Sequence, residues 1–506
     1  MSASNSVAPE TPLVAAAAED PQISPEVDAV DQLKQKTISG ATSYMIRTLI
    51  LYGIGLGASA ILSAYLSVED FGIYGLVTQI VGLLTFFSDI GLASALIQKK
   101  DEPTITEYRA VFTVQQMLSW LIFAITGAIW LSGIMEPKIG VQGVYVLLAL
   151  GISFPLASLK TIPSVMLERK LDFSKLVLPQ IVEQLVYNGL LIYCAINGYG
   201  VMSYTVAILA RSVVGVIAMS FIQRWPFGFS LDVKALRAMM GTGVKFQIND
   251  LLARVKDQLF YIFLGNYLPL QQFGYITFAK QWSFMPYQLT VQNVIAITFP
   301  TYSRLQHDKQ LLKRAIEKTL LFISLLIFPM LVGMTLLIIP VTHVIPKYVK
   351  WQPALLTFGL FTLSIGWSAI STPLTNTLNA IGKINRTLQL MIMWTTMTWI
   401  ITPVMMYFFG FNGVAIAAMI ISFSSVLPII YVREYVKIDV WDQVWRQLVA
   451  AAVMALAGVL ALDFMKAGLV QIAVGGAVMG GVYGLALIGV GRAKLELELR
   501  SLRKRR

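Results

Sequence analysis

Charged side chains inside long apolar runs are the residues of this sequence that could do chemistry. An ionised side chain at the centre of a bilayer costs about 2.5–3.5 kcal/mol on insertion scales, so each one needs a partner or a task. Six cations and four acids occupy such positions, which leaves a net charge of +2. The cations are Arg47, Arg211, Lys245, Arg254, Lys256 and Lys280, and the acids are Asp89, Glu183, Asp250 and Asp257.

Half of these charges fall between residues 245 and 257. On a helix, Asp250, Arg254 and Asp257 share one face, four and then three positions apart, and can pair with each other. A second polar face, about 140° away, carries Lys245 and Lys256 with Asn249 and has no acid of its own. A helix with two polar faces is expected to line a cavity rather than to face lipid.

The excess of cations favours a water-filled cavity that binds an anionic substrate, because guanidinium and ammonium groups suit phosphate oxygens. The alternative is that the charges pair with one another and lock helices together. The acids Asp89, Glu183, Asp250 and Asp257 could couple transport to an ion or serve only in such pairs. The candidate substrate-binding residues are Arg47, Arg211, Lys245, Asn249, Arg254, Lys256 and Lys280.

The sequence lacks the residues that a disulfide, a metal site or an ATP site would need. The chain has two histidines and one cysteine, Cys194, so it can form no internal disulfide and has no Cys/His cluster for a metal. It contains no glycine-rich phosphate loop followed by Lys and Ser or Thr, which argues against an ATP site. We therefore expect no catalytic residues, no cofactor and no metal.

The elements that must position these charges are membrane-spanning helices. Apolar residues make up 56% of the chain and charged residues 13%, against about 45–50% and about 25% in soluble domains. The apolar residues form runs of about twenty or more, as a spanning helix requires. The sequence predicts an all-α polytopic protein with about fourteen spans, near 40–65, 71–98, 109–133, 140–161, 174–196, 200–223, 237–264, 271–299, 315–340, 352–379, 385–408, 412–432, 444–464 and 468–491.

The distribution of basic residues sets the orientation. Of 39 lysines and arginines, 29 lie in segments that would be cytoplasmic, Lys160 among them, if both termini are inside. Four lie in outer loops, at Lys138, Lys347, Lys350 and Lys466, and six lie in spans. A basic inner surface facing anionic lipid accounts for the net charge of +12, so no nucleic-acid partner is expected.

An internal repeat divides the chain. Tyr65-Leu-Ser-Val-Glu-Asp-Phe-Gly72 and Tyr267-Leu-Pro-Leu-Gln-Gln-Phe-Gly274 share Tyr, Leu, Phe and Gly at an offset of 202. A weaker echo links Gly198-Tyr-Gly-Val201 to Gly410-Phe-Asn-Gly-Val414. Six spans per repeat make the repeats parallel, as in alternating-access transporters. The predicted parts are a disordered cytoplasmic tail (1–36), two six-helix bundles (37–230 and 231–436), two further helices (437–491) and a basic cytoplasmic tail (492–506).

Four stretches carry a family likeness. They are Ile61-Leu-Ser-Ala-Tyr-Leu-Ser-Val-Glu-Asp-Phe-Gly-Ile-Tyr74, Phe87-Ser-Asp-Ile-Gly-Leu-Ala-Ser-Ala-Leu-Ile-Gln98, Glu168-Arg-Lys-Leu-Asp-Phe173 and Asp257-Gln-Leu-Phe-Tyr-Ile-Phe-Leu-Gly265. The chain resembles the polysaccharide transporter family, bacterial flippases of lipid-linked oligosaccharides in the superfamily that also holds multidrug and toxin extrusion transporters and lipid II flippases.

The resemblance implies two bundles in a V around a charged cavity. It further implies a substrate of undecaprenyl-diphosphate-linked oligosaccharide, moved from the inner to the outer leaflet of the bacterial inner membrane for surface polysaccharide synthesis. A polysaccharide polymerase and other assembly proteins would be partners beside the lipid bilayer.

Two other functions fit the sequence less well. A small-molecule or multidrug efflux pump of the same superfamily is expected to favour an acidic cavity, which the net +2 in the spans disfavours. A membrane polymerase or ligase would need a large outer loop with catalytic residues, whereas the longest outer loop here has only about ten residues. We therefore expect a transporter and not an enzyme.

Overall fold

The computed structural model describes residues 50–85, 88, 91–99, 101–170, 172–233, 236 and 255–503, and every regular element within these ranges is a helix. This confirms the all-α class. Before the gap at 237–254 the helices are the first helix (Ile50–Tyr65), α2 (Val68–Thr85), α3 (Leu92–Gln98), α4 (Ile105–Leu131), α5 (Glu136–Arg169), α6 (Phe173–Ile196) and α7 (Met202–Ile222).

The second half begins with a π-helical turn and ends with three helices beyond the repeat. In order they are η1 (Val255–Leu259), α10 (Phe260–Tyr267), α11 (Leu270–Tyr287), η2 (Gln288–Gln292), α12 (Asn293–Leu305), α13 (Lys309–Val344), η3 (Pro346–Ala354), α14 (Leu355–Ala380), α15 (Ile384–Phe409), η4 (Gly410–Asn412), α16 (Gly413–Ser422), η5 (Phe423–Ser425), α17 (Val426–Arg433), α18 (Val440–Leu460), α19 (Leu462–Met465) and α20 (Leu469–Arg503).

The helices have the length and surface of membrane spans. Within the described ranges, nine stretches are long and apolar enough to cross a bilayer, and one of them, Ile384–Arg433, covers two of the predicted spans. Large apolar side chains on these helices face outward, for example Phe221 at 77% and Leu460 at 79% exposure. Such surface suits lipid and would be unfavourable in water. The total of fourteen spans stays a prediction.

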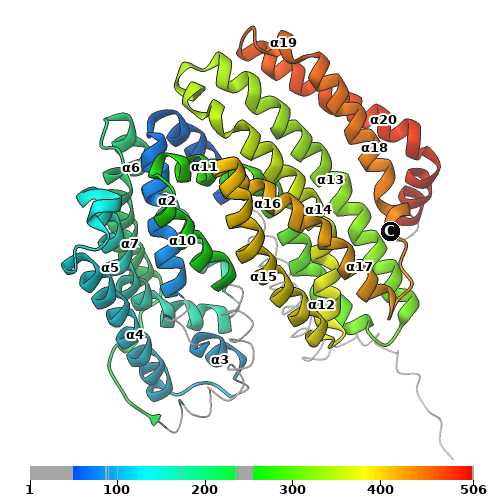
Figure 1. Cartoon of the computed structure of the whole chain (residues 1–506). Helices are drawn as coiled ribbons and strands as arrows, with labels where there is room; N and C mark the ends of the chain where they lie inside the picture. The colour runs from blue at the N-terminus through cyan, green and yellow to red at the C-terminus, as the bar shows by residue number, and fades with distance from the viewer. Residues whose placement is uncertain are drawn as a thin grey trace, which may run out of the picture.

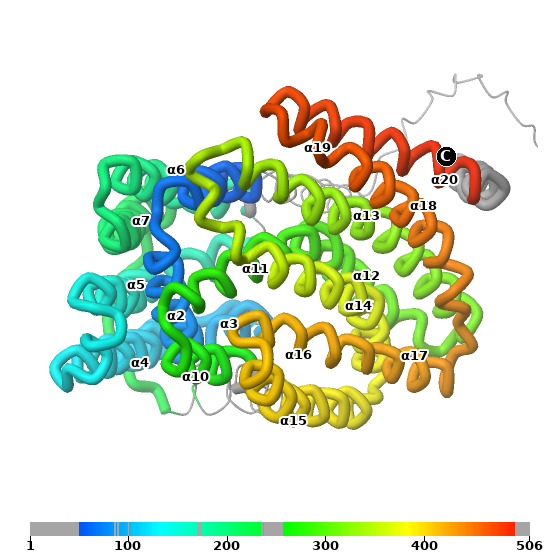
Figure 2. The backbone as a smooth tube through the Cα atoms, turned by 45° about the horizontal axis from the view of Figure 1, so that its top comes forward, coloured from blue at the N-terminus to red at the C-terminus, as the bar shows by residue number. Residues whose placement is uncertain are grey.

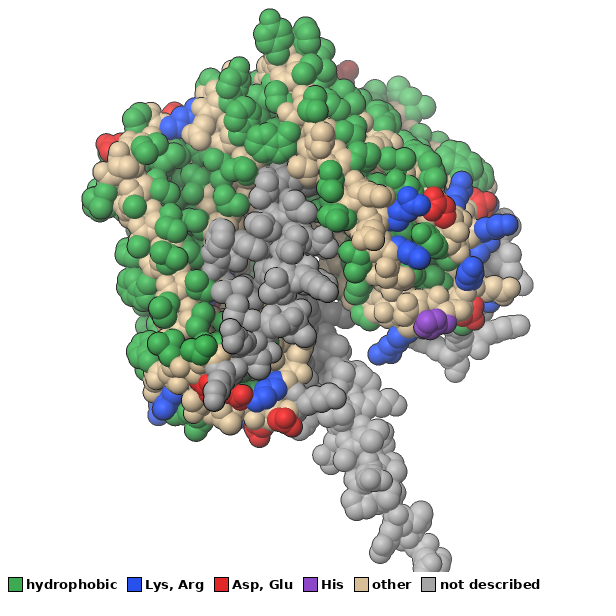
Figure 3. Space-filling view, turned by 60° about the horizontal axis from the view of Figure 1, so that its bottom comes forward, with side chains coloured by type: hydrophobic (Ala, Val, Ile, Leu, Met, Phe, Trp, Pro, Cys, Tyr) green, Lys and Arg blue, Asp and Glu red, His purple; other side chains and the backbone are tan. Residues whose placement is uncertain are grey.

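Two groups of helices make up the molecule, as Figure 1 shows. One contains α4 to α7 and the other contains α12 to α17, and they meet where α2 packs against α11. The last helices, α18 to α20, pack along α13 on the side away from the first group (Figure 2). In the space-filling view, the visible charged side chains gather mainly in one group at the lower left and one at the right, beside bands of apolar side chains (Figure 3).

The α2–α11 contact is symmetric between the two repeats. A Cβ atom added to Gly72 would lie 2.1 Å from the carbonyl oxygen of Leu270, and one added to Gly274 would lie 2.0 Å from that of Val68. Both pairs of positions are related by the repeat offset of 202. Each repeat therefore presents a glycine to the start of the other repeat's helix, and the likeness between residues 65–72 and 267–274 reflects the packing.

The Glu168–Phe173 stretch has a structural role. Arg169 donates to the carbonyl oxygens of Leu96 at 2.6 Å and of Lys99 at 2.9 Å, which lie at the end of α3. A guanidinium there satisfies carbonyl groups that a helix end leaves free. Asp172 caps α6 by accepting from the amide of Lys175 at 3.3 Å. These residues fix how α3, α5 and α6 join.

Candidate functional site

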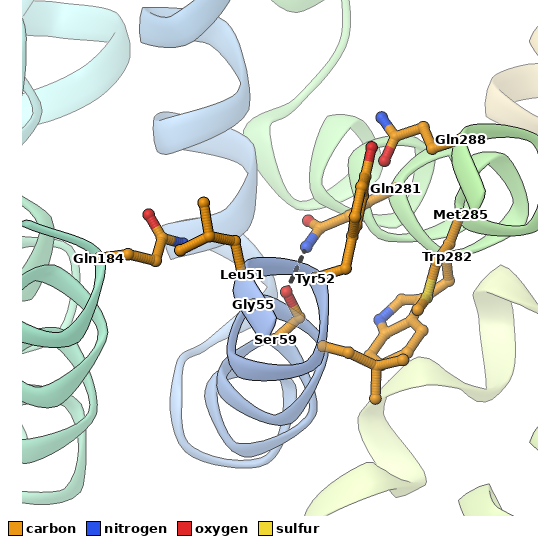
Figure 4. Close-up of a pocket in the computed structure, with 10 residues that line it drawn as sticks. Leu51, Tyr52, Gly55, Ser59, Gln184, Gln281, Trp282, Met285 and Gln288 are labelled. Atoms are coloured by element: carbon orange, nitrogen blue, oxygen red, sulfur yellow. Dashed lines mark hydrogen bonds between the residues drawn. The ribbon is translucent and has the colours of Figure 1, made fainter. Parts of the chain in front are cut away.

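A cavity of about 420 Å³ lies between the first helix, α6 and α11 (Figure 4). Its wall has amide, hydroxyl and aromatic side chains and, among the described residues that line it, no charge. Gln281 Nε2 donates to Ser59 Oγ at 3.1 Å, which links the two halves across the cavity. The lining residues are Leu51, Tyr52, Gly55, Leu56, Ser59, Gln184, Gln281, Trp282, Met285 and Gln288.

Three glutamines give this cavity its chemistry. Gln184 comes from α6, Gln281 from α11 and Gln288 from η2, so both halves of the chain contribute. Each amide can donate and accept hydrogen bonds, which is what a ligand with many hydroxyl groups needs. Gln281 and Gln288 are seven positions apart, about two helical turns, and therefore lie on the same side of their helical segment.

A second polar cavity of about 350 Å³ adjoins the first, since Leu51 and Gln184 line both. It contains an ion cluster of three residues, which we call the Glu183 cluster. Lys160 Nζ lies 2.5 Å from Glu183 Oε1, and Arg211 Nε lies 3.6 Å from Glu183 Oε2. Two cations against one acid leave the cluster with a charge of +1.

Three helices position the Glu183 cluster. Lys160 stands on α5 between Pro155 and Pro163, Glu183 on α6 and Arg211 on α7. Glu183 can approach α7 only because residue 215 is glycine: an added Cβ there would lie 2.2 Å from the carboxylate oxygen. The Glu183 side chain is 9% exposed, whereas that of Arg211 is 46% exposed. Arg211 is thus the member of the cluster most open to a ligand.

Three tyrosines pack in a chain of contacts that begins at Arg211. The guanidinium carbon lies 5.5 Å from the ring centre of Tyr187. The hydroxyls of Tyr187 and Tyr74 are 3.2 Å apart, and the Tyr74 ring stacks on Tyr204 with centres 3.6 Å apart. These contacts tie Arg211 to α2 and limit its movement.

The predicted site residues fall into three groups. Arg211 and Glu183 come together in the cluster just described. Lys280 lies apart from both cavities' walls, with its ammonium 3.5 Å from the ring centre of Tyr261, and Asp257 is exposed on η1. The positions of Arg47, Asp89, Lys245, Asn249, Asp250 and Arg254, and the side chain of Lys256, lie outside the described residues.

Lys160 and the glutamines were not among the predicted site residues. The count of basic residues places Lys160 in a cytoplasmic segment, but α5 continues to Arg169 and carries Lys160 inside a candidate span, paired with Glu183. The signal that could have found it is the acid of an otherwise apolar span, which needs a cation. Gln281 stands out in the sequence only as the repeat partner of Gln79.

A third cavity, of about 890 Å³, is chemically different. It lies between α13, α14, α17 and α18, and leucine, valine, alanine and isoleucine make up most of its wall. Arg433 is the charged residue among those that line it. Such a wall offers little to a glycan, so the two polar cavities are the candidate site for one.

Comparisons with known proteins agree with this arrangement. Residues 61–354 match the sequence family described as "Polysaccharide biosynthesis protein". The chain is 22% identical over 319 residues to the succinoglycan biosynthesis transport protein ExoT of Rhizobium meliloti (strain 1021). This match covers 62% of this chain and 63% of that protein. It is 20% identical over 312 residues to the lipopolysaccharide biosynthesis protein WzxC of Escherichia coli (strain K12), covering 60% and 61%. Each match thus spans less than two thirds of the relative's length.

Solved structures share the fold. The lipid II flippase MurJ, in an inward closed conformation, superposes with a TM-score of 0.69 at 16% identity, over 89% of this chain and 99% of that one. An inward-facing multidrug resistance transporter of the MATE family, in the MOP superfamily, gives 0.61 at 14% identity, over 78% and 98%. Since the family match covers more than half of the sequence and the fold agrees with it, this chain belongs to the polysaccharide biosynthesis protein family.

Proposed function

We propose that this protein is a flippase for a lipid-linked oligosaccharide. It would move an undecaprenyl-diphosphate-linked repeat unit from the inner to the outer leaflet of the bacterial inner membrane, with both of its own termini in the cytoplasm. The names of the two relatives, one for succinoglycan transport and one for lipopolysaccharide biosynthesis, support a glycan cargo. The observation that carries the proposal is the pair of adjoining cavities, one neutral and rich in amides and one with a charge of +1.

The two cavities fit the two polar parts of such a substrate. The diphosphate would pair with Arg211, the exposed member of the Glu183 cluster, because a guanidinium can hold two phosphate oxygens at once. The sugars would lie against Gln184, Gln281 and Gln288, whose amides exchange hydrogen bonds with hydroxyl groups. The predicted cations Arg47, Lys245 and Lys256 would add positive charge around the diphosphate, whereas Lys280 lies against the Tyr261 ring away from both cavity walls. The polyprenyl tail would stay in lipid.

Alternating access would then carry the polar head across. Binding of the anion offsets the excess positive charge of the cavity, and the two groups of helices would rock about the site to expose it outward. Asp257 and Asp89 are the candidates for coupling to an ion. A drug efflux function is less well supported, because the acid of the described site, Glu183, is already matched by two cations.

Deletion of the gene in its own bacterium tests the proposal. We expect the deletion strain to lose surface polysaccharide and to accumulate the lipid-linked repeat unit, and the wild-type gene to restore export. A Lys160→Met/Arg211→Met variant should fail to restore it at equal membrane levels. The matched control is Lys175→Met, which removes a 61% exposed cation of α6 that pairs with Asp172 outside both cavities.

Three outcomes would count against parts of this picture. Surface polysaccharide that persists in the deletion strain contradicts the flippase. Full export by the double variant contradicts the anion site but leaves the flippase standing. Unchanged polysaccharide together with greater sensitivity to cationic drugs would point to the efflux function instead.

A further inference from the structure

Lys138 crosses from the first half of the molecule to the second. It stands at the start of α5, just before the chain bends at Gly140. Its ammonium donates to the carbonyl oxygens of Asn266 at 3.0 Å and Leu268 at 2.7 Å. Both carbonyls lie at the end of α10, where a helix leaves acceptors without partners and carries partial negative charge.

Lys350 makes the same contact in the opposite direction. It belongs to η3 in the second half, and its ammonium donates to the carbonyl oxygens of Ala64, at 3.0 Å, and Leu66. These carbonyls lie at the end of the first helix (Ile50–Tyr65). Each lysine therefore joins a helix end in the other half of the chain.

The two contacts are copies of one another within the repeat. The acceptors are related by the offset of 202, since 266 − 64 and 268 − 66 both equal 202. The donors are related by 350 − 138 = 212, the offset that also relates Gly410 to Gly198. The residues that follow them, Ile139 and Trp351, are both buried in one core cluster and hold the lysine backbones in place.

The two lysines flank the glycine contact between α2 and α11. The end of the first helix runs directly into α2, and the end of α10 runs directly into α11. Further donors reinforce the Lys350 side: Trp351 Nε1 donates to the carbonyl oxygen of Ser63 at 2.7 Å, and Lys347 lies 3.3 Å from the ring centre of Tyr65. This end of the molecule is therefore closed by packing in the middle and by ammonium groups on both sides.

We propose that Lys138 and Lys350 are a symmetric pair of latches that hold the outer end of the protein closed, and that both release when the cavity opens outward. The inference rests on the alternating access of the proposed function and on the orientation predicted from the basic residues, which places this end outside. It gives a reason for cations on a side of the membrane where few are expected. Of the other two predicted outer lysines, Lys347 lies against the Tyr65 ring, and Lys466 pairs with Asp463 of its own segment.

Cysteine labelling from outside tests the latches. The native Cys194 is replaced by alanine, a reporter cysteine is placed in the cavity as Ser59→Cys, and spheroplasts are treated with a maleimide that does not cross membranes. Lys138→Met and Lys350→Met keep the aliphatic stem but lose the donors. We expect each to raise the labelling rate several-fold, and the double variant to raise it by about the product of the two.

Matched variants separate release of a latch from general disruption. Lys138→Arg and Lys350→Arg keep a cation with donors and should label as slowly as the parent, as should Lys466→Met, which removes an outer lysine away from the latches. A chain with Lys466→Cys, labelled in parallel, reports how much protein is inserted. If the double variant does not reach the membrane, the two single variants carry the test.

The readout does not depend on the substrate. A labelling rate that stays at the parent value in both single methionine variants overturns the latches, whatever the glycan assay gives. Faster labelling in a protein whose deletion leaves surface polysaccharide unchanged would keep the latches and reject the flippase.

Discussion

Glu183 is the residue on which the described site depends. Its side chain is buried on α6, and α5 and α7 supply the cations that pair with it. A carboxylate so placed stabilises the bundle through its partners, and its removal leaves Lys160, whose side chain is 18% exposed, without an acid. In the proposed function, the cluster therefore joins a structural role for Glu183 and Lys160 to a ligand-binding role for Arg211, whose side chain is 46% exposed.

Substitution of Glu183 separates these roles. Glu183→Gln should lower the free energy of unfolding by about 3 kcal/mol, since breaking a buried ion pair from one side leaves an unmatched charge. The double variant Lys160→Met/Glu183→Leu should recover most of that loss. Thermal unfolding of purified protein in detergent measures both, and a double variant no more stable than Glu183→Gln would contradict the pairing.

At the scale of single residues, the sequence left open whether Glu183 couples transport to an ion or pairs with a cation, and in the structure it pairs with Lys160 and Arg211. An acid in an apolar span indicates a buried pair, and Glu183 has one. Its partner Lys160 was missed because it lies at the very end of the predicted span 140–161 and was counted with the cytoplasmic cations, whereas α5 continues to Arg169 and keeps Lys160 inside the helix. The glutamines were missed because an uncharged amide in a span carries no large energetic signal.

At the scale of elements, α2 and α11 depend on small residues where they cross. Gly72 and Gly274 each face a backbone carbonyl of the other helix. Gly75 faces Thr277, and a Cβ atom added to Gly75 would lie 2.4 Å from Thr277 Oγ1. Small residues let two helices approach closely, which is how helices in membranes commonly gain packing contacts. Because the obstacle at Gly72 is backbone, no side-chain rotation can make room for a larger residue.

Gly72→Ala should therefore push α2 and α11 apart. We expect a lower melting temperature and faster labelling of a cavity cysteine from outside. The control is Gly189→Ala on α6, where an added Cβ would meet no atom within 4 Å. A Gly72→Ala protein that melts and labels as Gly189→Ala does would show that the helices do not pack at this glycine.

The helices themselves were predictable because long apolar runs have one solution in lipid. The crossing of α2 and α11 was not, since a repeated Tyr-Leu-x-x-x-x-Phe-Gly stretch indicates duplication without saying that the two copies touch. The break of the span predicted at 271–299 into α11, η2 and α12 was also beyond hydropathy, which averages over such local changes of helix type.

At the scale of the whole molecule, the parallel repeats and the positions of Lys138 and Lys350 lead to one prediction, that both lysines lie on the outer side of the membrane. Lys138 and Lys350, both predicted to lie outside, each bind a helix end in the opposite half of the molecule. An even number of spans is what lets both repeats enter the bilayer from the same side and form symmetric contacts at one end.

Topology mapping tests this statement directly. Alkaline phosphatase is active only outside the inner membrane, so a fusion after Lys466, between α19 and α20, should be active and a fusion after Arg506 should not. A fluorescent protein that matures only in the cytoplasm should give the reverse. Activity of the phosphatase at both sites would mean that α20 does not span, which would make the number of spans odd and place the C-terminus outside.

The latches require Lys138 and Lys350 on the same side of the membrane. A phosphatase fusion in the loop before α5 and one after Val344 must therefore give the same result. If the two fusions differ, the repeats are not parallel and the symmetric latches cannot face one leaflet.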